Sequence, residues 1–114
     1  MQRDNIERRA EILPGTLSLL ILKTLSAGPL HGYGIAQHIK RLSEEVLRVE
    51  EGSLYPALQR MLVKGWVTSE WVQAGPKRRA RVYRLTPLGR KQLAAEVSTF
   101  TRVIGAIMRV IQPA

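Results

Sequence analysis

Residues 51–84 read EGSLYPALQRMLVKGWVTSEWVQAGPKRRARVYR, and this stretch decides the fold. Its first half predicts an amphipathic helix over about residues 52–64, because apolar side chains recur at the spacing of one buried helical face. These side chains are Leu54, Leu58, Met61 and Leu62. The opposite side presents groups that can form hydrogen bonds, make apolar contacts or meet phosphate: Ser53, Tyr55, Pro56, Gln59, Arg60 and Lys64. We expect Pro56 in the first turn, where its missing N–H costs no intrahelical bond.

The second half predicts a β-hairpin with a positively charged tip. Strand candidates at about residues 66–71 and 80–85 flank a turn at residues 74–79, which contains a glycine-proline pair. The cations of this wing are Lys77, Arg78, Arg79 and Arg81. A helix sized for the major groove, followed by a cationic two-stranded wing, is typical of a winged helix-turn-helix. The predicted fold class is therefore α+β, mostly α with a small β hairpin.

The charge of the chain suits a polyanionic partner. The formal net charge is +9 and the pI is about 10.9, which favours nucleic acid first and an anionic membrane surface second. No acidic residue lies between Glu70 and Glu96, although seven basic residues do. The chain has no cysteine, begins without the apolar run of a signal peptide, and has its most apolar segment, residues 17–25, far short of a membrane span. We expect a soluble, cytoplasmic protein without membrane contact.

The winged helix-turn-helix domain is predicted to span residues 13–86, after an N-terminal arm or helix at residues 1–12. Its first core helix is expected over residues 16–27, where a glycine-proline pair then ends it. A second helix is expected over residues 33–42, with inward-facing side chains at Ile35, Ile39 and Leu42. The connection at residues 43–51 is predicted to include a short extended stretch that pairs with the wing.

The last segment, residues 87–114, predicts a long dimerisation helix. Thr86 is a suitable N-cap, and Pro87 suits the first helical position. Apolar residues then recur at alternating spacings of four and three, as a heptad-like stripe: Leu93, Val97, Phe100, Ile104, Ile107 and Ile111. A helix that reaches Ile111 would be about 37 Å long, more than the preceding residues can easily cover. Burial of the stripe against a second copy is favoured over a helix that folds back on its own core.

No set of residues indicates catalysis or a bound metal. His31 and His38 are the only histidines, and neither has carboxylates or a second histidine at metal-ligand spacing, so a structural role is favoured. The glycines that follow His31 are not a nucleotide-binding loop, because no strand precedes them and no lysine–serine/threonine pair follows. We expect no enzymatic activity, no metal and no cofactor. A small hydrophobic effector stays open, because Trp66 or Trp71 could line a ligand site or a dimer cleft instead of packing in the core.

Each candidate DNA contact stands beside a simpler alternative. Ser53 and Tyr55 would meet base edges or phosphates, or else cap the helix and pack against the wing, respectively. Arg60 suits a bidentate contact with guanine, whereas a phosphate contact or a solvated charge is the alternative. The wing cations would neutralise phosphates, or place an arginine in a narrow minor groove. Arg81 could instead lie within the strand with its stem packed on the sheet.

Four blocks of sequence resemble the PadR family of bacterial transcriptional regulators. They are PLHGY at residues 29–33, GSLYPAL at 52–58, GWV at 65–67 and RVYRLTPLG at 81–89, and the resemblance runs in order from about residue 13 to 93. It implies a homodimeric winged helix-turn-helix, usually a repressor, of the short subgroup whose C-terminal helix is the main dimer element. It also places Ser53, Tyr55, Pro56 and Arg60 on the groove-reading helix, and residues 77–81 on the wing.

The sequence therefore predicts a homodimeric, sequence-specific repressor that binds double-stranded DNA. Residues 52–64 would enter the major groove, and residues 74–81 would contact the backbone or the minor groove. The alternative from another class is a basic protein–protein or membrane-surface adaptor built on a winged-helix scaffold.

Overall fold

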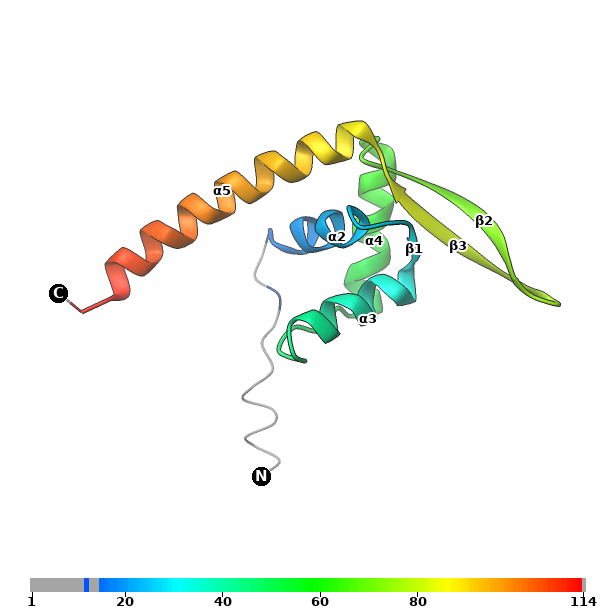
Figure 1. Cartoon of the computed structure of the whole chain (residues 1–114), viewed down its shortest axis with the longest axis horizontal. Coiled ribbons are helices and arrows are strands. Elements are labelled where there is room, and N and C mark those ends of the chain that lie inside the picture. Colours follow the sequence, from blue (N-terminus) through cyan, green and yellow to red (C-terminus); the bar gives the residue numbers. More distant parts are fainter. Residues whose placement is uncertain (1–11, 13–14, 114) are drawn as a thin grey trace, which may run out of the picture.

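The computed structural model describes residue 12 and residues 15–113, so the predicted N-terminal arm lies almost entirely outside the described residues. The helices and strands follow one another along the chain (Figure 1) in the order α2 (Leu17–Leu25), β1 (Leu30–His31), α3 (Gly32–Leu42), α4 (Glu51–Val63), β2 (Val67–Gly75), β3 (Arg78–Leu85) and α5 (Pro87–Ile111). The predicted α+β class is confirmed. The molecule measures 59 × 40 × 21 Å, because the β2–β3 wing and α5 extend from the domain in opposite directions.

The core forms where α2, α3 and α4 meet the base of the wing. Its largest fully buried side chains come from all four elements: Ile21, Leu22, Leu25, Ile35, Leu54, Leu58, Met61 and Val67. One inward prediction is wrong, because Leu42 is 68% exposed. The helix ends there, and the chain reverses through Glu44 and Glu45, both at positive φ, so that Leu47 packs against the core instead.

The three-stranded antiparallel sheet has the order β1-β3-β2. Its third strand differs from the prediction: Leu30 pairs with Tyr83 and His31 with Val82, so the edge strand precedes α3. Within the connection 43–51, Leu47 is an isolated bridge residue, and it packs with Val49 against the core. The short β1 could not be predicted from periodicity, because two residues cannot show an alternation.

The wing strands are longer than predicted. β2 continues past Trp71 to Gly75, β3 begins at Arg78, and only Pro76 and Lys77 form the turn, with a register shift between Gln73 and Gly75. Trp66 precedes β2, so the two tryptophans do not mark the ends of one strand. Trp66 is half-buried and packs against the core, whereas Trp71 is 57% exposed.

Helix α5 begins as predicted, with Thr86 as N-cap and Pro87 in its first turn. The backbone N–H of Gly89 donates to Thr86 Oγ1 at 2.9 Å, and the same hydroxyl donates to the carbonyl of Gly65 at 2.7 Å. The first half of the helix packs on α2, where Ser18 donates to Glu96 at 3.2 Å, and Leu93 is half-buried against the core. The distal half leaves the domain (Figure 1).

Gly89 lets α5 approach the end of α4 closely. A Cβ at this position would overlap the carbonyl oxygen of Trp66 and press on the side chain of Leu85. Gly89→Ala should therefore lower the free energy of unfolding by about 3 kcal/mol, the cost of overpacking against backbone that cannot yield. Gly52→Ala is the matched control, because a Cβ there meets nothing within 4 Å. Urea unfolding followed by far-UV circular dichroism, at equal protein concentration, measures both; equal stabilities would contradict the close approach.

Candidate nucleic-acid interface

The residues predicted for the outer side of α4 are all exposed, the last of them at the C-cap position of the helix. The buried face consists of Leu54, Ala57, Leu58 and Met61, each at most 3% exposed. Opposite them lie the exposed residues Ser53, Tyr55, Pro56, Gln59, Arg60 and Lys64. The helical period therefore predicted correctly which side of α4 faces away from the core.

Helix α4 begins one residue earlier than predicted, and this changes the positions of two residues. The N-cap is Glu50, without a side-chain capping bond, so Ser53 lies inside the first turn and does not cap the helix. Pro56 is the sixth helical residue and not part of the first turn. It has no N–H for the carbonyl of Gly52, but Gly52 is exposed and water can bond that oxygen. The helix continues because its opposite face is anchored in the core.

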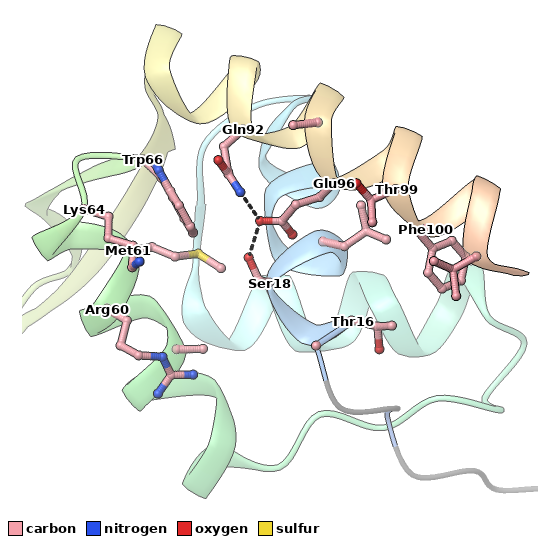
Figure 2. Close-up of a pocket in the computed structure, with 15 residues that line it drawn as sticks. Thr16, Ser18, Arg60, Met61, Lys64, Trp66, Gln92, Glu96, Thr99 and Phe100 are labelled. Atoms are coloured by element: carbon pink, nitrogen blue, oxygen red, sulfur yellow. Dashed lines mark hydrogen bonds between the residues drawn. The ribbon is translucent and has the colours of Figure 1, made fainter.

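The predicted residues of α4 fall on two flanks of its exposed face. Tyr55 lies on the flank toward the wing, where it lines a groove with Trp71 and Tyr83. Arg60 and Lys64 line a separate cleft of about 640 Å³ between α2, α4 and α5 (Figure 2). Lys64 Nζ lies 5.1 Å from the ring centre of Trp66 in that region. The structure thus brings Tyr55 to the wing and keeps Arg60 and Lys64 apart from it.

The start of α3 holds Tyr55 in place. A Cβ at Gly32 would lie 2.7–2.9 Å from the hydroxyl end of the Tyr55 ring, closer than real contacts allow. Next to it, His31 caps α3 by accepting a hydrogen bond from the Gly34 N–H at 3.0 Å, and its ring stacks on Tyr33 at 6.3 Å. The structural role predicted for His31 is therefore seen. The glycine that follows it makes room for an aromatic side chain of the neighbouring helix.

One face of the wing carries a row of aromatic and cationic side chains. Trp71 pairs across the strands with Arg81, and its ring centre lies 6.0 Å from the Arg81 guanidinium and 5.2 Å from that of Arg79. Arg81 also lies 5.7 Å from the ring centre of Tyr83 and donates from Nε to Ser69 Oγ at 2.9 Å. Arg81 lies within β3, the position that its alternative predicted, and its contact with DNA stays a prediction. Lys77 occupies the turn, whereas Arg78 and Arg79 belong to β3.

The wing, α3 and α4 enclose a groove of about 660 Å³. Its lining residues supply hydroxyls, rings and cations, and none is acidic: His31, Gly32, Tyr33, Tyr55, Trp71, Ala74, Arg78, Ala80, Arg81 and Tyr83. Such a surface can donate hydrogen bonds to an extended anion and balance its negative charge. In the described part of the chain, no cluster of three or more histidine and acidic residues could hold a metal ion. Among residues 12 and 15–113, no helix has the length and apolar character needed to cross a bilayer.

The sequence reasoning missed the role of Trp71 as the partner of two arginines. The alternatives predicted for this residue are packing in the core, a ligand site or a dimer cleft. Extending the alternation of β2 and β3 to the glycine-proline turn would have placed Trp71, Arg79 and Arg81 on one face. Tyr33, which is 66% exposed beside the groove, had no periodic signal because it lies at a helix start.

The helices α2, α3 and α4 and the three-stranded sheet together form a winged helix-turn-helix. The chain belongs to the transcriptional regulator PadR-like family, whose family model matches residues 21–95. A relative named an uncharacterized 37.1 kDa protein in transposon TN4556 of Streptomyces fradiae is 37% identical over 95 residues, which are 83% of this chain. The chain spans only 26% of that relative's length.

Solved structures share the fold. A transcriptional regulator from Clostridium thermocellum superposes with a TM-score of 0.81 at 26% identity, over 86% of this chain and 95% of that chain. Bacillus subtilis PadR in complex with operator DNA superposes with a TM-score of 0.67 at 26% identity, over 73% of this chain and 47% of that chain. The sequence of the negative transcriptional regulator PadR of Bacillus subtilis is 29% identical over 68% of this chain and 42% of its own length.

The contact between Gly32 and Tyr55 can be tested without a ligand. Gly32→Ala should move the Tyr55 ring, because the overlapping atoms belong to the far end of a rotatable side chain. The expected change in unfolding free energy is below about 1 kcal/mol, as the ring is already partly in solvent. Nuclear Overhauser effects between the Tyr55 ring and the α protons of residue 32 should disappear. Gly52→Ala lies in open space on α4, the helix that carries Tyr55, and should keep these effects. Their survival in Gly32→Ala would refute the contact.

Proposed function

We propose that this protein is a sequence-specific DNA-binding transcriptional repressor that acts as a homodimer. The observation that carries the proposal is the exposed polar face of α4 beside a cationic wing that has a groove free of acidic lining residues. The winged helix-turn-helix relative from Bacillus subtilis that was solved with operator DNA supports this use of the fold. Its name as a negative regulator supports repression rather than activation.

In the proposed complex, α4 lies in the major groove and the wing contacts the backbone or the minor groove. Residues 52–64 present Ser53, Tyr55, Pro56, Gln59, Arg60 and Lys64 to the duplex. The wing adds Lys77, Arg78, Arg79 and Arg81. Base-edge contacts set sequence preference, whereas phosphate contacts set register and affinity. A protein acting on the chromosome in this way works in the cytoplasm without a membrane partner or enzymatic chemistry.

Arg60 is the residue proposed to read a base. Arg60→Ala should weaken binding to the preferred site by about 1–3 kcal/mol and weaken random duplex less, the result for a bidentate guanine contact. Arg102→Ala on the distal half of α5 removes the same charge away from α4 and is the control. Sites selected from random duplex DNA provide the preferred sequence, and titrations at one salt concentration provide both affinities.

The outcomes of that experiment separate the candidate functions. Equal losses on preferred and random duplex would make Arg60 a phosphate contact. A wild-type protein that selects no sequence, and binds duplex weakly and without preference, would favour the alternative of a basic adaptor for proteins or membrane surfaces.

The apolar stripe of α5 carries the proposal of a dimer. Beyond Leu93, which packs on its own core, the stripe is largely in solvent in the single chain, with exposed fractions of 42% at Val97, 46% at Ile107 and 65% at Ile111. Phe100 is 36% exposed, and Ile104 is half-buried. Apolar surface left in water costs about 25 cal/mol per Å². The distal half of α5 leaves the domain (Figure 1), so a second copy is the proposed cover.

A charge on this stripe should break the dimer. Ile107→Asp places two carboxylates in the proposed interface and removes two large apolar side chains, so dimerisation should weaken by about 3–6 kcal/mol. Ser98→Asp introduces the same charge on the opposite side of the helix and should leave the dimer intact. Sedimentation equilibrium measures both dissociation constants. A wild-type chain that stays monomeric at tens of micromolar concentration would overturn the homodimer.

The cleft between α2, α4 and α5 is the proposed location of any small hydrophobic effector. It is lined by side chains of Met61, Trp66 and Phe100, and also by Glu96, which accepts hydrogen bonds from Ser18 at 3.2 Å and from Gln92 at 2.7 Å (Figure 2). Because Arg60 lines the same cleft, an occupant there would be coupled to the DNA-facing helix.

A further inference from the structure

We propose that Trp71 is a positioning residue: it orders Arg79 and Arg81 of the wing so that both bind phosphates of one stretch of DNA backbone. The inference rests on the proposed function and adds how the wing would bind DNA. The aromatic and cationic row on one face of the hairpin consists of Trp71, Arg79, Arg81 and Tyr83. Its inner end lines the groove beside Tyr55, so the backbone segment would run along the groove between α4 and the wing.

The register of the hairpin explains why these side chains meet. Trp71 lies directly opposite Arg81, and Arg79 is two residues from Arg81 on the same strand, so all three project from one face. The indole contacts both guanidinium groups, at 5.2 Å and 6.0 Å from its ring centre. Tyr83, which is only 4% exposed, continues the row into the core and fixes its inner end.

Aromatic contacts order the guanidinium groups without neutralising them. A carboxylate partner would hold an arginine equally well, but it would cancel the charge that a phosphate needs. Arg81 donates from Nε to Ser69 Oγ, so its two Nη groups are left to donate hydrogen bonds to an anion. Within the described residues, neither Arg79 nor Arg81 forms an ion pair, whereas Arg84 lies 3.7 Å from Glu70. The row thus keeps its full charge and loses side-chain freedom before binding.

Several features favour a polyanion over a single small anion. The groove is open, and its lining combines the tyrosines Tyr33 and Tyr55 with the arginines Arg78 and Arg81. Its cations continue to Lys77 in the turn, without an acidic residue in β3 or the turn. Trp71 is 57% exposed, so it holds the guanidinium groups at the surface of the wing, where phosphates can reach them. Repeated phosphates along one strand match such a row better than one isolated phosphate.

The test is a double-mutant cycle on DNA affinity, in the full chain. Trp71→Leu should weaken preferred and random duplexes alike by about 5-fold, the effect of losing two exposed cation–π contacts. In the background Arg79→Gln/Arg81→Gln, the same change should have almost no further effect, because Trp71 acts through those arginines. With Lys77→Gln as matched background, the 5-fold loss should persist. Trp71→Phe should retain most of the affinity, because a ring remains.

Salt dependence gives a second readout. Trp71→Leu removes no charge, so the slope of log affinity against log salt should change by less than about 1 unit. Arg79→Gln/Arg81→Gln should flatten it by up to about 3.6 units for the two wings of a dimer. Unfolding curves of each variant establish that the fold is intact.

Three results would overturn the inference. An equal loss from Trp71→Leu in the wild-type chain and in Arg79→Gln/Arg81→Gln would mean that the indole touches DNA itself. No loss in either chain would mean that Trp71 has no part in binding. A loss in Trp71→Phe as large as in Trp71→Leu would exclude an aromatic contact as the cause. These results leave the proposed function standing, whereas a wild-type protein that binds no duplex would overturn both.

Discussion

The orientation of every functional part depends on the packing of α5 against the carbonyl groups of Gly65 and Trp66. There, α4 has ended, β2 begins, and the return strand β3 passes into α5. The Thr86 hydroxyl donates to both carbonyl oxygens, at 2.7 Å and 3.0 Å, and accepts from the N–H of Gly89. Because Gly89 has no side chain, the helix axis can start against the Trp66 backbone. This small contact therefore helps to set the angles between α4, the wing and the long helix α5.

This constraint has a consequence for a dimer. In the proposed dimer, the distance and angle between the two α4 helices would be set by where the α5 helices cross and by how each α5 leaves its own domain. Because the start of α5 is rigidly packed, the crossing point of the two α5 helices would determine the distance and angle between the two α4 helices. Ser18 of α2 donates to Glu96 of α5 and adds a further contact between the two helices, while Gln92 of α5 donates to the same carboxylate. A dimeric winged-helix protein needs such stiffness, because spacing between two grooves of a duplex is a geometric requirement.

The sequence predicted the elements with strong periodicity and failed where the structure depends on long-range pairing. The buried face of α4 and the start of α5 followed from helical spacing and from Thr86-Pro87. Leu42 was placed inward by the same spacing, but the reversal at Glu44 and Glu45 gave its place to Leu47. β1 was missed because its two residues are defined only by their partner strand. The candidate site was predicted as a set of exposed residues, but not its division into two flanks, since that depends on where the wing lies.

The wing shows how a strongly basic surface can be ordered without acidic partners. Like charges placed side by side repel one another, so an arginine-rich hairpin would tend to splay its side chains into solvent. Carboxylates would restrain them but would compete with phosphate for the same donors. The face that carries Trp71 and Tyr83 restrains the guanidinium groups through aromatic rings instead, and the carboxylate of Glu70 serves Arg84. The basic segment noted in the sequence, with no acidic residue from 71 to 95, thus contains two aromatic residues, Trp71 and Tyr83, that lie against its arginines.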